Sequence, residues 1–138
     1  MVMQRERGTV VHEKSKRKGV LGSVTWTVGA EATNAITVSG QALDEAGNAM
    51  SEACAFQWYW ANDSAGLTPT TTAHDGGTAA GTDGAIIEQV ANLSGIAVTE
   101  ADGDIDIIAT DAGAFTTYLV AVNPDGTISV SGAVTHAA

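Results

Sequence analysis

The chain has 138 residues, of which 44% are hydrophobic and 16% charged, a composition that suits one domain with a tail. All six basic residues lie in the first 18 positions, so that residues 1–18 carry a formal charge of +4 and the remaining 120 residues carry −14. A body without Lys or Arg should be repelled by nucleic acid and by anionic lipid headgroups, because binding to phosphate relies on these residues, and only the arm could bind DNA.

The first segment of the chain, residues 1–22, lacks any sustained apolar period and is predicted to be an extended N-terminal arm. No apolar run follows its basic residues, so a secretory signal is not expected. The segment GTVVH, residues 8–12, is suited to adding a strand to the edge of a partner's sheet. The residues predicted to bind a partner are the six bases: Arg5, Arg7, Lys14, Lys16, Arg17 and Lys18.

The rest of the chain, residues 23–138, is predicted to be all-β, and its first strands are marked by alternation. Val24, Trp26 and Val28 occupy every second position, which is the period of a strand with one buried face. Residues 34–43 alternate in the same way, with a slip near the glycine at position 40 that suggests a bulge.

A turn at residues 44–49, DEAGNA, precedes the densest apolar run of the chain. In that run, ACAFQWYWAND, the side chains of Phe56, Trp58 and Trp60 fall on one face, which predicts a central core strand. If they were exposed instead, the aromatic residues would offer a platform for stacking sugars, but an apolar run favours packing in the core.

Residues 62–84 are rich in Asn, Asp, Ser, Thr and Gly and are predicted to form a long surface loop. His12, His74 and His136 are far apart in the sequence, and we expect them to be scattered surface residues. His74 is followed by Asp75, but no nucleophile is fixed beside this pair, so a catalytic arrangement is not indicated.

The second half of the chain continues with short strands separated by turns. The clearest pair is a hairpin in which Tyr118, Val120 and Val122 alternate before an NPDG turn. A helical turn around residues 88–94 is an alternative for one short stretch. Seven or eight strands of this spacing predict a β-sandwich. The predicted strands are 85–90, 95–100, 104–110, 115–122 and 127–136.

The sequence EADGDIDI, residues 100–107, is the motif closest to a metal site. Asp102, Asp104 and Asp106 resemble the opening of a calcium loop, but Ile107 and Gly113 stand where that loop needs a Gly and a bidentate Glu. We therefore expect a turn followed by a strand with its acids facing solvent. No cofactor, metal or enzymatic activity is predicted for the chain, and its single cysteine excludes an intrachain disulfide.

Two resemblances add to this interpretation. Short strands with Trp58 or Trp60 on the third and Tyr118 on a late one are similar to the immunoglobulin-like sandwich, in which such a Trp packs in the core and such a Tyr ties down a corner. The runs DEAGNA, GGTAAGTDGAII, EADGDIDI and TYLVAVNPDGTISVSGAVTHA resemble small Ig-like virion proteins of tailed bacteriophages, over roughly residues 35–138. The second resemblance implies a structural role without chemistry.

The expectation from the sequence is therefore an immunoglobulin-like β-sandwich, residues 23–138, that decorates the exterior of a phage capsid after synthesis in the host cytoplasm. Its arm, residues 1–22, would bind the major capsid protein and neighbouring copies of the same chain through charge-assisted hydrogen bonds. The alternative is a module on a tail or fibre that makes weak contacts with host-surface glycans through residues 62–84 or the aromatic strand.

Overall fold

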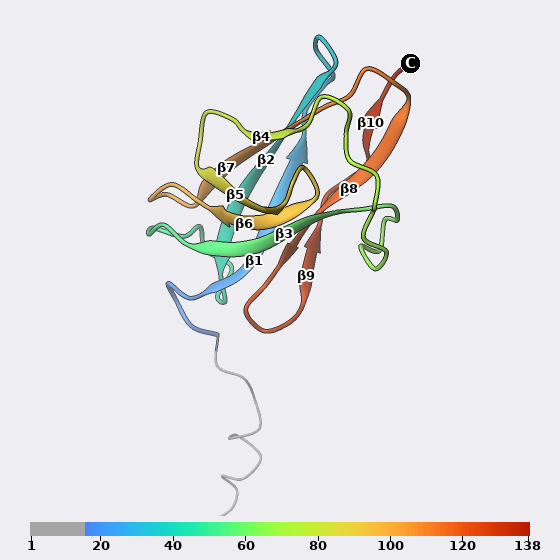
Figure 1. The fold of residues 1–138 in the computed structure, drawn as a ribbon. Helices are drawn as coiled ribbons and strands as arrows, with labels where there is room; N and C mark the ends of the chain where they lie inside the picture. Colours follow the sequence, from blue (N-terminus) through green and yellow to red (C-terminus); the bar gives the residue numbers. More distant parts are fainter. Residues whose placement is uncertain (1–15) are drawn as a thin grey trace, which may run out of the picture.

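The computed structural model describes residues 16–138, and over these residues the protein is all-β. Two antiparallel sheets pack face to face, and Figure 1 shows the chain entering at one end of the pair. No helix in the described part of the chain has the length and apolar character needed to cross a bilayer. The expected all-β class and the two-sheet arrangement are confirmed.

The smaller sheet has the order β1-β2-β7-β4, and the larger one has the order β10-β8-β3-β6-β5, with β9 pairing with β8 as well. Consecutive strands are joined by turns, several of which place a glycine at positive φ, as at Gly47, Gly103 and Gly126. The strands are β1 Leu21–Val28, β2 Ala35–Asp44, β3 Ala55–Ala61, β4 Thr78–Ala80, β5 Ala85–Val90, β6 Ser94–Val98, β7 Asp104–Thr110, β8 Phe115–Val122, β9 Ile128–Val130 and β10 Val134–His136.

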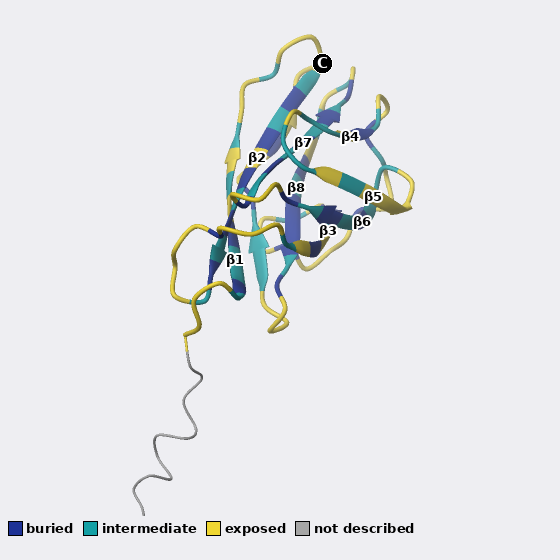
Figure 2. Cartoon of the chain, turned by 90° about the vertical axis from the view of Figure 1, so that its left-hand side faces the viewer, coloured by how far each residue is buried: buried dark blue, intermediate teal, exposed yellow. Residues whose placement is uncertain are grey.

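The hydrophobic core lies between the sheets, where the inward faces of β2, β3, β7 and β8 meet (Figure 2). Phe56, Trp58 and Trp60 point into it from β3, the middle strand of the larger sheet, and the two tryptophans are each 1% exposed. Ile105 and Ile107 face them from β7 and are fully buried. The predicted central strand and the predicted inward face of β7 are both confirmed.

The expected bulge near Gly40 is wrong, because β2 runs through this position in regular register with both neighbours. Gly40 pairs with Trp26 on β1 and with Ile105 on β7. A Cβ atom built on Gly40 would lie 2.6 Å from Cζ3 of Trp26, so the indole ring occupies the space above the glycine. The glycine therefore makes room for an aromatic ring, and the irregularity in the β1–β2 pair lies between Leu21 and Ser23 instead.

Ten strands are present in residues 16–138, more than the expected seven or eight. The region predicted as one strand at 127–136 is divided into β9 and β10 at Ser131. There the hydroxyl of Ser131 accepts a hydrogen bond from the Leu119 amide at 2.8 Å, while the Ser131 amide donates to the Leu119 carbonyl. A side-chain oxygen thus takes the place of a ladder bond where the strand is interrupted.

The segment 62–84 also contains more structure than a surface loop, since it includes β4 and returns to the core. His74 is 2% exposed and Thr78 is 8% exposed. Thr78 accepts a hydrogen bond from the indole nitrogen of Trp60 at 3.0 Å, which satisfies a buried donor. No helical turn forms at 88–94; β5 and β6 form a hairpin there.

On β8 the alternating set Tyr118, Val120 and Val122 lies on the outer face, and Leu119 with Ala121 faces the core. The tyrosine that fastens a neighbouring segment is Tyr59, whose hydroxyl donates to the Gly66 carbonyl at 2.6 Å. This bond holds the first part of the 62–84 segment against the outer face of the larger sheet, so that β8 has apolar residues on both sides.

The contact between Trp26 and Gly40 predicts that Gly40→Ala will lower the free energy of unfolding by about 1–3 kcal/mol, as overpacking in a core typically does. The matched control is Gly132→Ala, because the nearest atom to an added methyl there is Cγ2 of Val28 at 3.9 Å. We expect the control to change stability by less than about 0.5 kcal/mol. Urea unfolding of both variants measures this, and equal stability of the two would contradict the proposed packing.

Candidate interaction site at the N-terminal end

The described chain begins at the end of the body where β2 turns toward β3. The amide of Gly19 donates to Oδ2 of Asp44 at 3.0 Å, and the amide of Glu45 donates to the Val20 carbonyl at 2.8 Å. Strand β1 then starts at Leu21, just before the arm–body boundary expected from the sequence. The last residues of the predicted arm are therefore attached to the body.

The carboxylate of Asp44 is the centre of this attachment. Besides Gly19, it accepts hydrogen bonds from the amides of Ala46 at 3.0 Å and Asn48 at 2.9 Å, both through Oδ1. Asp44 is 6% exposed. The hydrogen bond from Gly19, followed by that from Asn48, holds the pKa of the Asp44 carboxyl below its ordinary value of 3.8, because these amides stabilise the ionised form.

Arg17 pairs with the next residue of the same turn. Its Nε lies 2.9 Å from Oε1 of Glu45 and its Nη2 lies 3.0 Å from Oε2, a bidentate arrangement. The hydrogen bonds and the charge of Glu45 raise the pKa of Arg17. The Glu45 side chain is 8% exposed, whereas that of Arg17 is 59% exposed, so the carboxylate is covered while the guanidinium remains at the surface.

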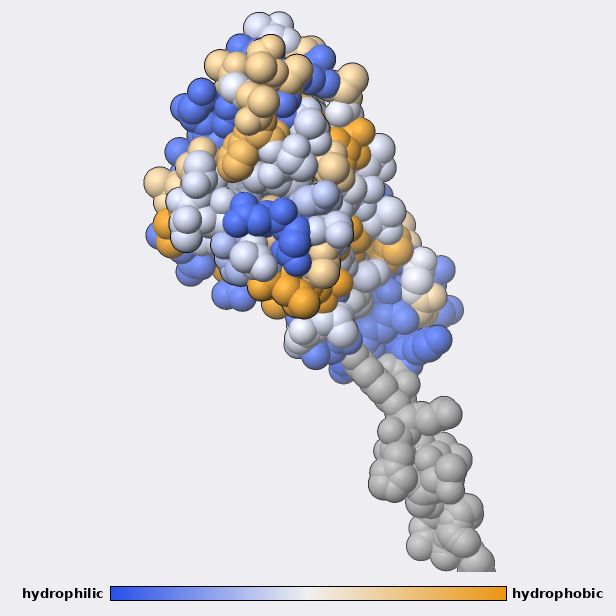
Figure 3. Space-filling view, turned by 90° about the vertical axis from the view of Figure 1, so that its right-hand side faces the viewer, coloured by the Kyte–Doolittle hydropathy of each residue, from blue (hydrophilic) through white to orange (hydrophobic). Residues whose placement is uncertain are grey.

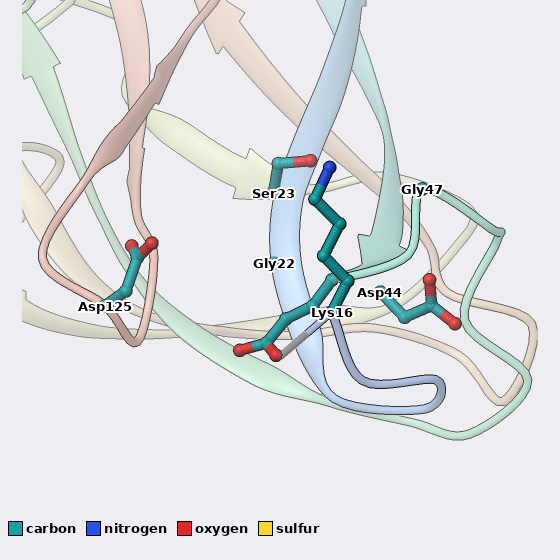
Figure 4. A pocket seen from close by; sticks show the side chains of 7 residues that line it. Lys16, Gly22, Ser23, Asp44, Gly47 and Asp125 are labelled. Atoms are coloured by element: carbon teal, nitrogen blue, oxygen red, sulfur yellow. The ribbon is translucent and has the colours of Figure 1, made fainter. Parts of the chain in front are cut away.

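A groove of about 310 Å³ lies beside this attachment, between β1 and two turns. Figure 4 shows Lys16 extending alongside β1 toward Ser23, with Asp44 and Asp125 on either side of the strand. Lys16 and Lys18 are exposed. Of the six predicted binding residues, the structure brings Lys16, Arg17 and Lys18 together here, and Arg5, Arg7 and Lys14 lie outside the described residues.

A second polar groove, of about 330 Å³, lies on the outer face of the smaller sheet. Asp83, Asp104 and Asp106 line it together with hydroxyl and amide groups of β1 and β2. Partial burial and the nearby acids Asp102, Asp83 and Asp106 raise the pKa of the Asp104 carboxyl. Within residues 16–138, no group of three or more His, Cys, Asp or Glu residues is placed to hold a metal ion.

The aromatic residues of β3 do not form a sugar-stacking surface, because Trp58 and Trp60 are buried. A mostly apolar groove of about 250 Å³ does lie on the outer face of the larger sheet, where Tyr59, Pro69 and Val90 contribute to its lining.

The prediction of scattered surface histidines is wrong for His74 and His136, which form a buried pair, and His12 lies outside the described residues. The ring of His74 lies 5.4 Å from that of His136 and 4.6 Å from that of Trp60, and its Nε2 is 2.9 Å from Oγ1 of Thr117. Burial, together with a smaller effect of the nearby His136, lowers the pKa of His74 to about 4. The carboxylates of Asp111 and Asp75 act in the opposite direction. His74 is thus a neutral core residue.

Sequence reasoning did not find either of these clusters. The one available signal for the attachment was the Asp at the start of DEAGNA, a residue type that commonly bonds to turn amides. The histidine pair gave no signal, because β8 and β10 bring together residues that are far apart in the chain. No protein-family model matches the chain, and no curated protein is significantly similar to it.

The attachment at Asp44 predicts that Asp44→Asn will lower the thermal midpoint by several degrees and increase hydrogen exchange at the Gly19 amide. The difference from the wild type should be largest above the ordinary carboxyl pKa of 3.8 and shrink as the pH falls below it, because protonation removes the same contribution from the wild type. Glu52→Gln, at an exposed position, is the control and should leave Gly19 exchange unchanged. Unaltered exchange in Asp44→Asn would refute the attachment.

Burial of His74 predicts a loss of stability in mild acid. The unfolded chain binds a proton near pH 6.5 and the folded protein only near pH 4, so stability falls as the pH drops between these values. The loss is about 3 kcal/mol at about 1.4 kcal/mol per pKa unit. In His74→Gln this part of the pH dependence should disappear, as measured by urea unfolding from pH 7 to pH 4. An unchanged slope would show that other groups cause it.

Proposed function

We propose that the protein is a structural component of a virion, a bacteriophage capsid decoration protein whose basic N-terminal arm attaches it to the head shell. The observation that carries this proposal is the segregation of charge. Every Lys and Arg lies in residues 1–18, and the body that follows has fourteen acids and no base. Attraction to acidic groups of a shell is then available only through the arm.

The attachment geometry supports this use of the arm. Asp44 fixes the chain at Gly19, so the residues that precede it start from one end of the sandwich. Figure 3 shows a group of strongly hydrophilic residues at that end, with further hydrophilic residues elsewhere on this face. A single exposed ion pair contributes about 0–1 kcal/mol, so several bases acting together are needed for stable binding.

We further infer that the body is immunoglobulin-like. The neighbours β1-β2-β7-β4 and β9-β8-β3 follow the order of strands A-B-E-D and G-F-C of that fold. The buried tryptophans of β3 stand where the fold has its core Trp. The hairpin β5–β6 departs from the pattern, because it extends the larger sheet only after the chain has passed through β4.

The alternative function is binding of host glycans by a module on a phage tail or fibre. Its support is the groove beside Tyr59 and Pro69, together with Leu67, which is 75% exposed on the adjoining segment. A protein of this kind would leave head shells undecorated, so the experiment that tests the first function also separates the two.

The proposed attachment predicts that neutralising the arm abolishes shell binding while the body stays folded. The variant replaces Arg5, Arg7, Lys14, Lys16 and Lys18 by Gln and keeps Arg17, which pairs with Glu45. Co-sedimentation with head shells assembled without this protein measures binding. The control replaces Arg5 and Arg7 by Lys, which retains the charge and should retain most of the binding. Full occupancy by the neutralised variant would refute the proposal.

A further inference from the structure

The outer edge of β5, Ala85–Val90, has no neighbouring strand in the described part of the chain. Of its six residues, only Ile86 packs against the core. Figure 2 shows this strand largely exposed, on the side of the molecule opposite β1. A strand in this position presents free amide and carbonyl groups to any chain that can pair with it.

The other sheet edges are closed or short. The Val24 amide of β1 donates to Oγ of Ser129 and the Trp26 indole donates to the Ser129 carbonyl, both at 3.1 Å, so β1 is joined to β9. Strands β4 and β10 have three residues each. The strand β5 is therefore the longest edge that is not closed by other described residues.

The side chains of β5 favour an apolar and cationic partner. The large hydrophobic side chains of residues 16–138 that are most exposed are Leu67, Ile87 and Val90, and the latter two, 59% and 52% exposed, lie on β5. Acidic residues accompany them: Glu88 on the strand itself, Asp83 just before it, and Glu100, whose Oε2 accepts from the Gly84 amide at 3.4 Å. The body supplies no Lys or Arg to neutralise these acids.

The N-terminal segment of the chain has the complementary composition. Residues 8–12, GTVVH, contain β-branched residues and no Pro, and Arg5, Arg7 and Lys14 flank them. We propose that residues 8–12 of a second copy of this chain add as a strand to the outer edge of β5. Because successive side chains of a strand point to opposite faces, one of the two valines would lie beside Ile87, and the flanking bases would face Asp83, Glu88 and Glu100.

The length of the chain favours a second copy over the same one. In the larger sheet β5 lies four strand spacings from β9, which is about 19 Å at about 4.8 Å per spacing, and β9 adjoins the edge of β1. His12 precedes Lys16 by four residues, which span at most about 13 Å at about 3.3 Å each. The end of residues 8–12 that is nearer to Lys16 therefore cannot reach the β5 edge of its own body. For the β5 edge of a neighbouring body there is no such limit.

A regular ladder is available over Ala85–Glu88, because the register with β6 shifts between Glu88 and Val90. This shift limits the added strand to a short segment, which matches the length of GTVVH. The proposal concerns contacts between copies and does not depend on attachment to a shell. It is tested with the full-length protein alone in solution.

The first test is the oligomeric state at low ionic strength, measured by sedimentation over a range of protein concentrations. We expect the wild type to self-associate and the association to weaken with salt. Val10→Pro, which removes a strand amide, and Ile87→Lys, which places a like charge on the edge, should both convert the protein to monomers. Leu67→Lys adds the same charge at a more exposed site away from β5 and should associate like the wild type.

The second test is disulfide cross-linking in a Cys54→Ser background. One copy carries Val11→Cys and a second, tagged copy carries Ile87→Cys, with Thr27→Cys on β1 as the control for Ile87→Cys. We expect a covalent dimer only with the β5 position. Folding of each variant is checked by its near-ultraviolet circular dichroism, since Trp58 and Trp60 report core packing.

Three results would overturn the proposal. The wild type could remain monomeric at all concentrations, the association could persist in both Val10→Pro and Ile87→Lys, or a chain with both cysteines could close a disulfide within itself. A monomeric wild type whose shell binding is lost in Ile87→Lys would assign the edge to the shell protein instead. Failure of the shell-binding experiment, in contrast, leaves these solution results unaffected.

Discussion

The carboxylate of Asp44 is the interaction on which the proposed role of this protein depends. It closes the turn after β2 and at the same time binds the Gly19 amide, so it fixes the point at which the cationic segment joins the acidic body. A nearly buried, ionised acceptor with three amide donors holds this junction more firmly than the pair of Arg17 and Glu45 does, because the guanidinium of Arg17 is exposed and solvent screens its charge. The arm therefore starts from a defined position.

The separation of charge has a physical basis in how this sandwich is built. Its core rests on apolar strands and on two tryptophans in β3, so no ion pair is needed within it. The acids that remain are placed on turns and outer faces, where Asp83, Asp104 and Asp106 lie close together. Two such bodies repel each other, and attraction between copies must come from the segment that carries the bases.

The two outer edges of the sandwich differ, and the open one also suits the basic N-terminal segment. Ser129 joins β9 to β1 through one hydroxyl and one carbonyl, which closes the sandwich on one side. On the opposite side β5 keeps an apolar and acidic edge. This edge and the β-prone cationic segment would suit the proposed contact between copies. Shell attachment and self-association would then draw on some of the same bases, namely Arg5, Arg7 and Lys14.

Between Val24 and Val122 the sequence alone determined the positions of all strands but β4, the inward face of β3 and β7 and the turns at Gly47 and Gly126, because alternation and turn residues are local signals. The tertiary structure alone decided the rest. Gly40 forms a regular pair with Trp26 where a bulge was expected, and on β8 Tyr118 lies outside while Leu119 lies inside. The 62–84 segment returns to β8 and β10, which buries His74 beside His136. Those outcomes depend on which distant strands become neighbours, and a local pattern carries no information about that choice.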